Sequence, residues 1–132
     1  MPKQKPATDQ SRPALTRLSI RVDLASGARI GPGKIAVLEE IGRSGSISAA
    51  GRALRMSYRR TWQLVEELNV CFGQPVVETS AGGSGGGGAR LTEIGRVVIA
   101  TYRIIEADTA QAAQNHLHVL SRLTEGTPDK AA

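Results

Sequence analysis

The sequence predicts a mostly α-helical fold with a small β wing (α+β), arranged as a winged helix-turn-helix. Three observations support this class. Two helical segments within residues 47–72 are separated by a tight turn, a glycine-rich loop at residues 80–89 lies between two strand-like segments, and helical periodicity continues from Thr92 to about Leu123. A chain of 132 residues suffices for one such domain with an extended appendage.

Composition and charge narrow the class of protein. The formal net charge is +5 and the pI is about 10.0, which suits a polyanionic partner. Cys71 is the only cysteine, so no intrachain disulfide can form. Pro2, Pro6 and Pro13 interrupt the N-terminus where a signal peptide would be apolar, and no apolar run approaches the roughly 20 residues of a membrane span. We therefore expect a cytoplasmic protein with no membrane partner.

The N-terminal region combines a tail with short strands. Residues 1–14 are polar and rich in proline, and we expect them to be disordered. Arg29–Ile30 predicts a short strand that the following Gly-Pro-Gly sequence ends. A period-2 alternation within residues 15–24 predicts an earlier, half-buried strand, whose inward residues are Leu18, Ile20, Val22 and Leu24.

Three helices are expected to form the core of the domain. The first begins at Pro32 or Gly33 and ends at Gly42 or Gly45. The second is capped by Ser48, and the third, which runs to about Phe72, is capped by Ser57. Their inward residues are expected to be Ile35, Leu38 and Ile41, then Ile47, Ala50 and Leu54, and finally Thr61, Leu64 or Val65, and Leu68.

A wing and a long helix complete the predicted structure. Pro75–Glu78 and Ala89–Leu91 predict two short strands that flank the glycine loop. Thr92 is a candidate N-cap for a helix of some 32 residues, which at about 1.5 Å per residue would reach about 48 Å and outrun a core of this size. Its apolar stripe therefore predicts a homodimer joined through this helix; the stripe comprises Ile94, Val98, Thr101, Ile105, Ala112, Val119 and Leu123.

These elements divide the chain into four predicted segments. Residues 1–14 form a disordered tail, and residues 15–91 form the winged helix-turn-helix domain. Residues 92–124 form the long C-terminal dimerisation helix, and residues 125–132 form a second disordered tail.

A basic face on the helix-turn-helix predicts double-stranded DNA as the partner. The run from Arg52 to Arg60 contains four arginines and no acidic residue. Arginine binds guanine and glutamine binds adenine in a bidentate manner, which favours Arg59, Arg60 and Gln63 as readers of the major groove. The residues expected to contact DNA are Ser46, Ser48, Arg55, Ser57, Tyr58, Arg59, Arg60 and Gln63 of the helix-turn-helix, and Gly82, Gly83, Ser84, Gly85, Gly86, Gly87 and Gly88 of the wing.

Each of these features also has an ordinary structural alternative. The helices could form a simple three-helix bundle, and Trp62 fits a core residue better than a stacking platform. The run Gly83–Gly88 satisfies a dinucleotide G-x-G-x-x-G pattern, but no βαβ unit surrounds it. The alternative to a wing there is a flexible connection, whereas a glycine wing could approach the DNA backbone closely.

No catalytic constellation or metal site is predicted. His116 and His118 are two residues apart, so on a helix they face different ways and cannot share a metal ion. Cys71 fits a small buried apolar residue. Glu39 and Glu40 fit either a solvated helix face or a contact with another chain. We therefore expect no enzyme activity and no cofactor.

Several motifs carry a family resemblance. The chain contains Gly45-Ser-Ile-Ser48, Ser57-Tyr-Arg-Arg-Thr-Trp62 and Glu67-Leu-Asn69. Above all it contains Thr79-Ser-Ala-Gly-Gly-Ser-Gly-Gly-Gly-Gly-Ala89, followed by Leu91-Thr92 and Gly95. Together these motifs closely resemble the N-terminal DNA-binding domain of the ModE family of molybdate-responsive bacterial transcription regulators. The resemblance spans about Leu18 to Leu123, and the helix-turn-helix part also resembles LysR-type regulators.

The resemblance implies three properties. The helix that opens at Ser57 would read the major groove, the wing would contact DNA, and the final helix would join a dimer. ModE-type proteins continue into molybdate-binding domains that these residues do not include, so molybdate is an unlikely partner. The function expected is that of a sequence-specific DNA-binding transcription regulator, bacterial and ModE-like, without the molybdate-sensing domains. The alternative is a winged-helix protein–protein interaction module that does not bind DNA.

Overall fold

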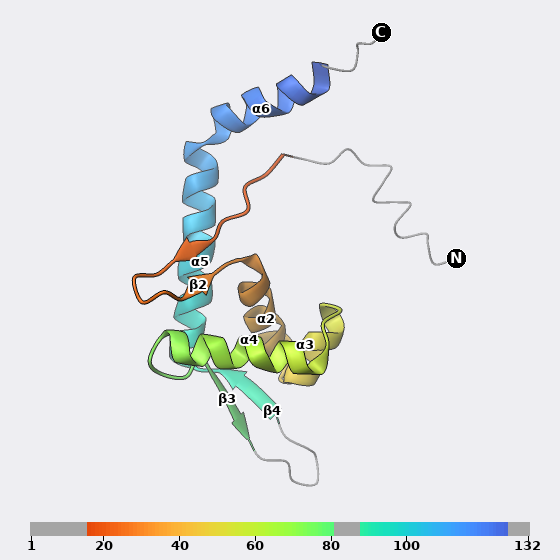
Figure 1. Ribbon diagram of the computed structural model, residues 1–132, viewed down its shortest axis with the longest axis vertical. Coiled ribbons are helices and arrows are strands. Elements are labelled where there is room, and N and C mark those ends of the chain that lie inside the picture. The colour runs from red at the N-terminus through yellow and green to blue at the C-terminus, as the bar shows by residue number, and fades with distance from the viewer. Residues whose placement is uncertain (1–15, 81–87, 127–132) are drawn as a thin grey trace, which may run out of the picture. The chain divides into compact units, whose positions relative to one another are not determined.

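The protein is mostly helical and carries two small antiparallel strand pairs, which confirms the predicted fold class. The computed structural model describes residues 16–80 and 88–126. Along the chain the elements are β1 (Val22–Asp23), β2 (Arg29–Ile30), α2 (Pro32–Ser44), α3 (Ile47–Ala53), α4 (Tyr58–Cys71), β3 (Val77–Ser80), β4 (Gly88–Leu91), α5 (Glu93–Ala112) and α6 (Gln114–Gly126) (Figure 1).

These elements fall into two compact units. One unit spans residues 19–107 and contains both strand pairs, α2 to α4 and most of α5. The other includes residues 108–126, which form the end of α5 and all of α6. The tail expected at residues 1–14 lies outside the described residues, and α6 extends into the tail expected at residues 125–132. Among the described helices, none has the length and apolar character to span a membrane.

Three helices pack into the core of the first unit, where α4 lies across α2 and α3 (Figure 1). The inward residues predicted for these helices are buried, except that Leu54 is only half-buried. Thr61 is a buried polar residue, and its hydroxyl donates to the Ser57 carbonyl oxygen at 2.7 Å. The largest fully buried side chains are those of Ile35, Val37, Leu38, Ile41, Thr61, Val65, Leu68 and Val76.

The boundaries of α2 follow from its flanking residues. Gly31 is extended and Pro32 occupies the first turn, where its missing N–H costs no helical hydrogen bond. At the other end Gly45 takes a left-handed conformation with φ 74°, and its N–H donates to the Ile41 carbonyl oxygen at 2.8 Å. The helix therefore ends at Ser44, immediately before Gly45, one of the glycines expected to end it.

The predicted cap of α3 is wrong by two residues. Ser46 is the N-cap: its backbone is extended, and its side-chain oxygen accepts a hydrogen bond from the Ala49 N–H at 3.0 Å. Ser48 lies inside the helix, where its hydroxyl accepts a hydrogen bond from Arg52 at 3.2 Å. Both serines have the chemistry of a cap, but the helix begins at Ile47 because that buried side chain must already face the core.

The N-terminal strand is shorter than predicted. Only Val22–Asp23 pair with Arg29–Ile30, although the alternation of half-buried and exposed side chains extends from Leu18 to Leu24 as expected. The stretch before β1 packs on α5 instead of pairing with a strand, because the Ile20 carbonyl oxygen accepts a hydrogen bond from the Tyr102 hydroxyl at 2.6 Å. Burial raises the pKa of Tyr102, which keeps this hydroxyl a donor.

The expected long final helix is divided into two. α5 ends at Ala112 and α6 begins at Gln114, while the Ala113 carbonyl oxygen accepts from the Leu117 N–H at 2.9 Å. None of residues 107–112 is buried, so tertiary packing does not hold the helix continuous there, and Asn115 with His116 has low helix propensity. The prediction of one continuous helix of some 32 residues is therefore wrong.

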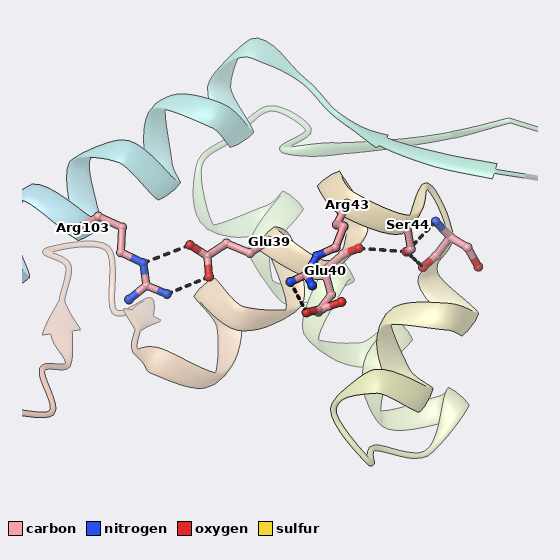
Figure 2. Close-up of polar contacts among 6 residues, drawn as sticks. Glu39, Glu40, Arg43, Ser44 and Arg103 are labelled. Carbon is pink, nitrogen blue, oxygen red and sulfur yellow. Dashed lines mark hydrogen bonds and ion pairs between the residues drawn. The ribbon is translucent and has the colours of Figure 1, made fainter.

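Arg103 joins α5 to α2 through an ion pair with Glu39 (Figure 2). The Arg103 guanidinium donates to both carboxylate oxygens of Glu39, at 3.0 and 2.7 Å. It also donates to Glu106 at 2.6 Å. The bond from Arg103 holds the pKa of the Glu39 carboxyl below its ordinary value, and both acids raise that of Arg103. Glu40 pairs with Arg43 on the same helix. Glu39 and Glu40 thus both form ion pairs within the chain.

Candidate nucleic-acid interface

The helix-turn-helix is closed by backbone contacts around Gly51. The Met56 N–H donates to the Gly51 carbonyl oxygen at 2.8 Å, which folds the chain back between α3 and α4. A Cβ atom on Gly51 would lie 2.6 Å from the Thr61 hydroxyl oxygen and 3.3 Å from the Met56 carbonyl oxygen. Only glycine therefore permits this close crossing of the two helices.

The turn places Arg55 in an unusual backbone conformation. Its φ is 60°, in the left-handed region that glycine and asparagine usually occupy. Arg55 is exposed, so its side chain gains no packing energy to offset the strain. Within the described residues, packing therefore does not offset the strain at Arg55.

The α3–turn–α4 surface is exposed and basic. Arg52, Arg55, Arg59 and Arg60 are all exposed, and within the described part of the chain none of them has a carboxylate partner. The other described arginines except Arg17 and Arg122 form at least one ion pair. This concentration of uncompensated positive charge is the electrostatic pattern that attracts a polyanion.

The start of α4 carries the side chains predicted to read bases. Ser57 caps the helix, since its side-chain oxygen accepts from the Arg60 N–H at 3.0 Å, as predicted. Tyr58 is 62% exposed, and Gln63 is exposed one turn further along. Because Thr61, Leu64 and Leu68 bury the opposite side of α4, its first two turns present their polar side chains outward.

The wing is a two-stranded antiparallel hairpin. Val77 pairs with Leu91 and Ser80 pairs with Gly88, so β3 lies two residues later than predicted and β4 starts one residue earlier. The shift arises at Val76 and Val77, whose N–H groups donate to the Asn69 side-chain oxygen at 2.8 and 3.2 Å. Of the predicted wing residues Gly88 is described, whereas Gly82, Gly83, Ser84, Gly85, Gly86 and Gly87 lie outside the described residues.

Two contacts fix the wing relative to the helices. Asn69 bonds the start of β3 to α4, and the Ala89 N–H donates to the Gly45 carbonyl oxygen at 3.0 Å, which ties β4 to the end of α2. The Thr92 hydroxyl donates to the Pro75 carbonyl oxygen and accepts from the Gly95 N–H at 3.1 Å, so Thr92 caps α5 as predicted. The helix-turn-helix and the base of the wing are thereby held as one body.

Sequence reasoning missed three residues of this surface. Asn69 was predicted only as part of the Glu67-Leu-Asn69 family motif. Its side-chain hydrogen bonds to the start of β3 join distant segments and leave no local pattern in the sequence. Arg52 was counted in the basic run, but its bond to Ser48 is visible only once α3 is in place. Trp62 is half-buried against the core, which agrees with the prediction, yet its indole N–H is buried without an acceptor in the described residues.

The described residues contain no alternative chemistry at this surface. They hold no group of three or more histidine, cysteine or acidic side chains placed to bind a metal ion. Cys71 is half-buried at the far end of α4, where burial raises the pKa of its thiol and disfavours the reactive thiolate.

Comparison with known proteins agrees with this geometry. Residues 33–96 match the family described as bacterial regulatory helix-turn-helix protein, lysR family. The chain is 46% identical over 86 residues to the molybdenum-pterin-binding protein MopB of Rhodobacter capsulatus, which covers 65% of this chain and 32% of that protein. It is 34% identical over 112 residues to the molybdenum transport protein ModE of Azotobacter vinelandii, covering 85% of this chain and 41% of that protein.

A third relative has a more explicit name. The chain is 38% identical over 90 residues to the DNA-binding transcriptional dual regulator ModE of Escherichia coli K12, covering 68% of this chain and 33% of that protein. The chain thus spans between about a third and two fifths of the length of these curated relatives.

Proposed function

We propose that the domain at residues 33–96 belongs to the LysR family of bacterial regulatory helix-turn-helix proteins. From this premise, the chain is a sequence-specific DNA-binding transcription regulator of the ModE-like type. The observation that carries the proposal is the exposed face of α3 and α4, whose arginines lack carboxylate partners among the described residues. It would act in the bacterial cytoplasm, where the DNA is.

The proposed contacts follow the geometry of the face. The first turns of α4 enter the major groove, where Arg59, Arg60 and Gln63 contact base edges. Arg55, in the turn, and the serines at 46, 48 and 57 contact the backbone, which fixes the position of α4 on the duplex. The wing is also proposed to contact the DNA, as the family resemblance implies.

We also propose a homodimer joined through α5. An apolar groove of about 360 Å³ lies beside this helix in the first unit, lined by Val22, Ile30, Phe72, Val98, Tyr102 and Ile105 among others. Val97 is 50% exposed and Ile104 is 59% exposed on the same helix. Apolar surface of this kind is rare on monomers and is covered when a second copy packs against it.

Molybdenum enters the proposal only through the relatives. MopB and the Azotobacter ModE bear molybdenum in their names, and the chain matches about a third to two fifths of their length. We therefore propose that target genes concern molybdenum, and that residues 16–126 do not themselves bind molybdate.

The proposed function is tested by selection from a random-sequence duplex library. The expected result is enrichment of one motif with two-fold symmetry, whose half-sites lie about one helical turn or a multiple apart. The Arg59→Ala and Arg60→Ala variants should lose this enrichment, whereas Arg122→Ala, an exposed arginine of α6, should keep it. Failure of the wild-type protein to enrich any motif would favour the alternative of a protein–protein interaction module.

A further inference from the structure

A polar cleft lies where the helix-turn-helix meets the wing. Its volume is about 260 Å³, and residues from four elements are among those that line it: Ser46 and Ile47 at the start of α3, Tyr58 and Trp62 on α4, Ser80 on β3 and Gly88 on β4. The cleft therefore adjoins the basic face but contains none of its arginines.

The Trp62 indole N–H is the unexplained group in this cleft. It is buried and has no hydrogen-bond acceptor within the described residues. The indole nitrogen can only donate, and leaving a buried donor unpaired costs about 1–3 kcal/mol. The Tyr58 ring meets the Trp62 ring edge to face, with centroids 6.2 Å apart, so the tryptophan has little freedom to turn its N–H toward solvent.

The hydroxyl groups around Trp62 are also available as donors. The Ser80 oxygen accepts from the Gly88 N–H at 3.2 Å, and the Ser46 oxygen accepts from the Ala49 N–H at 3.0 Å. In each case the serine uses its oxygen, and its own O–H proton can still be donated. The Tyr58 hydroxyl is on a side chain that is 62% exposed. No carboxylate is among the residues that line the cleft.

We propose that this cleft binds one phosphate oxygen of the DNA backbone through neutral donors, with the Trp62 N–H and the hydroxyls of Tyr58, Ser46 and Ser80 around it. The inference rests on the proposed DNA binding and adds a contact that is independent of base sequence. Hydroxyl-bearing side chains line the cleft without a carboxylate, and the Trp62 N–H has no acceptor among the described residues; such donors suit an oxyanion. Gly88, which also lines the cleft, adds no side chain to it.

A neutral phosphate contact has a distinctive signature. Lysine and arginine release counterions when they bind phosphate, so each such contact steepens the salt dependence of affinity, whereas a neutral donor adds affinity without adding charge. Removal of a donor from the cleft should therefore weaken binding equally at every salt concentration. Removal of an arginine should instead make the decrease of log affinity with log salt concentration less steep.

The experiment uses the full chain and a 30-base-pair duplex of random sequence, so no operator is needed. Trp62 is the only tryptophan, and its emission reports on the cleft directly. DNA anisotropy and Trp62 emission are measured together at several salt concentrations for the wild type, Tyr58→Phe, Ser80→Ala and the matched control Ser26→Ala, whose hydroxyl lies in the β1–β2 turn. Inorganic phosphate is titrated in a separate arm.

The expected result is a change in Trp62 emission that follows DNA binding. Tyr58→Phe and Ser80→Ala should each lose about 3- to 10-fold in affinity, as expected for one hydrogen bond, with the salt slope unchanged, and Ser26→Ala should match the wild type. Binding seen by anisotropy without an emission change, and without loss in Tyr58→Phe, would overturn the cleft while leaving DNA binding intact. An equal emission change with millimolar inorganic phosphate, together with competition against DNA, would make the cleft a free-anion site instead. Absence of any anisotropy change in the wild type would refute the proposed function itself.

Discussion

At Arg55 the backbone conformation and the side-chain chemistry favour different residues. A φ of 60° suits glycine, and the left-handed conformation costs other residues about 1–2 kcal/mol. The exposed guanidinium gains nothing from packing, and in the proposed function its charge is directed at DNA. Arg55 is thus a place where stability and the proposed function can be separated by substitution.

We predict that Arg55→Gly raises the free energy of unfolding by about 1 kcal/mol, because the strain is relieved. The matched variant Arg55→Ala keeps the strain and should show no such gain. Both variants should bind DNA more weakly, since both lack the guanidinium. Urea unfolding and DNA anisotropy check the two effects. A DNA affinity equal to that of the wild type in both variants would remove Arg55 from the interface.

Gly51 sets how closely α3 and α4 cross. We predict that Gly51→Ala destabilises the protein by about 1–3 kcal/mol, because its Cβ would overlap the Thr61 hydroxyl and the helices would have to separate. Gly33→Ala is the control: nothing lies within 4 Å of a Cβ there, so the change should be neutral or stabilise α2 by up to about 1 kcal/mol. Thermal unfolding of both variants measures the difference, and an equal melting temperature for the two would contradict the close crossing.

At the scale of elements, the sequence predicted best those helices that bury one face. The inward faces of α2, α3 and α4 were predicted correctly apart from Leu54, because one buried stripe leaves a clear 3.6-residue pattern. The cap of α3 was predicted wrongly because Ser46 and Ser48 have the same chemistry, and only the burial of Ile47 decides between them. The DNA-contacting roles of the predicted residues remain predictions.

Contacts between distant segments explain the other differences. The start of β3 is displaced by the Asn69 side chain, and residues before β1 bond to Tyr102 instead of extending a strand. Neither bond has a local signature in the sequence. The division between α5 and α6 has a different cause, since a helix without buried residues at 107–112 depends on weak local propensities.

The bond between Arg103 and Glu39 fixes α5 on α2, and we predict that it contributes to stability in a pH-dependent way. Arg103 lowers the Glu39 pKa in the folded state, so the contribution is fully present above the ordinary value of 4.5 and is lost as the pH falls through the lowered folded value. Both side chains are partly exposed, so the effect should be at most about 1 kcal/mol.

The measurement is urea unfolding of the wild type and Glu39→Gln at pH 7 and pH 3. Glu39→Gln should be less stable at pH 7, and the difference should become smaller at pH 3, as the Glu39 carboxyl takes up a proton. Glu66→Gln, an exposed acid of α4 outside every ion pair that the described residues form, is the control and should match the wild type at both pH values. A difference of the same size at pH 3 and pH 7 would assign the effect to packing.

At the scale of the whole molecule, α5 is the element that we expect to join two copies. We predict that Val97→Lys combined with Ile104→Lys gives a monomer, because two charges would have to be buried in the apolar contact. Val70→Lys is the control, since Val70 is 80% exposed at the end of α4 and away from α5. Light scattering gives the mass of each. A dimer in the double variant would place the contact elsewhere, with residues 18–24 as the next candidate.

The central claim is that the unpaired arginines of α3 and α4 bind DNA, and the salt dependence of DNA affinity tests it most directly. Affinity for a random-sequence duplex is measured between low and high salt for the wild type, for Arg59→Ala/Arg60→Ala, and for the control Arg21→Ala/Arg29→Ala, which removes equal charge from residues paired with Asp23. We expect log affinity to fall steeply with log salt concentration for the wild type. The magnitude of this slope should be smaller by about 1–2 for Arg59→Ala/Arg60→Ala and close to that of the wild type for the control. Equal slopes for the two double variants, or a flat dependence in the wild type, would contradict the claim.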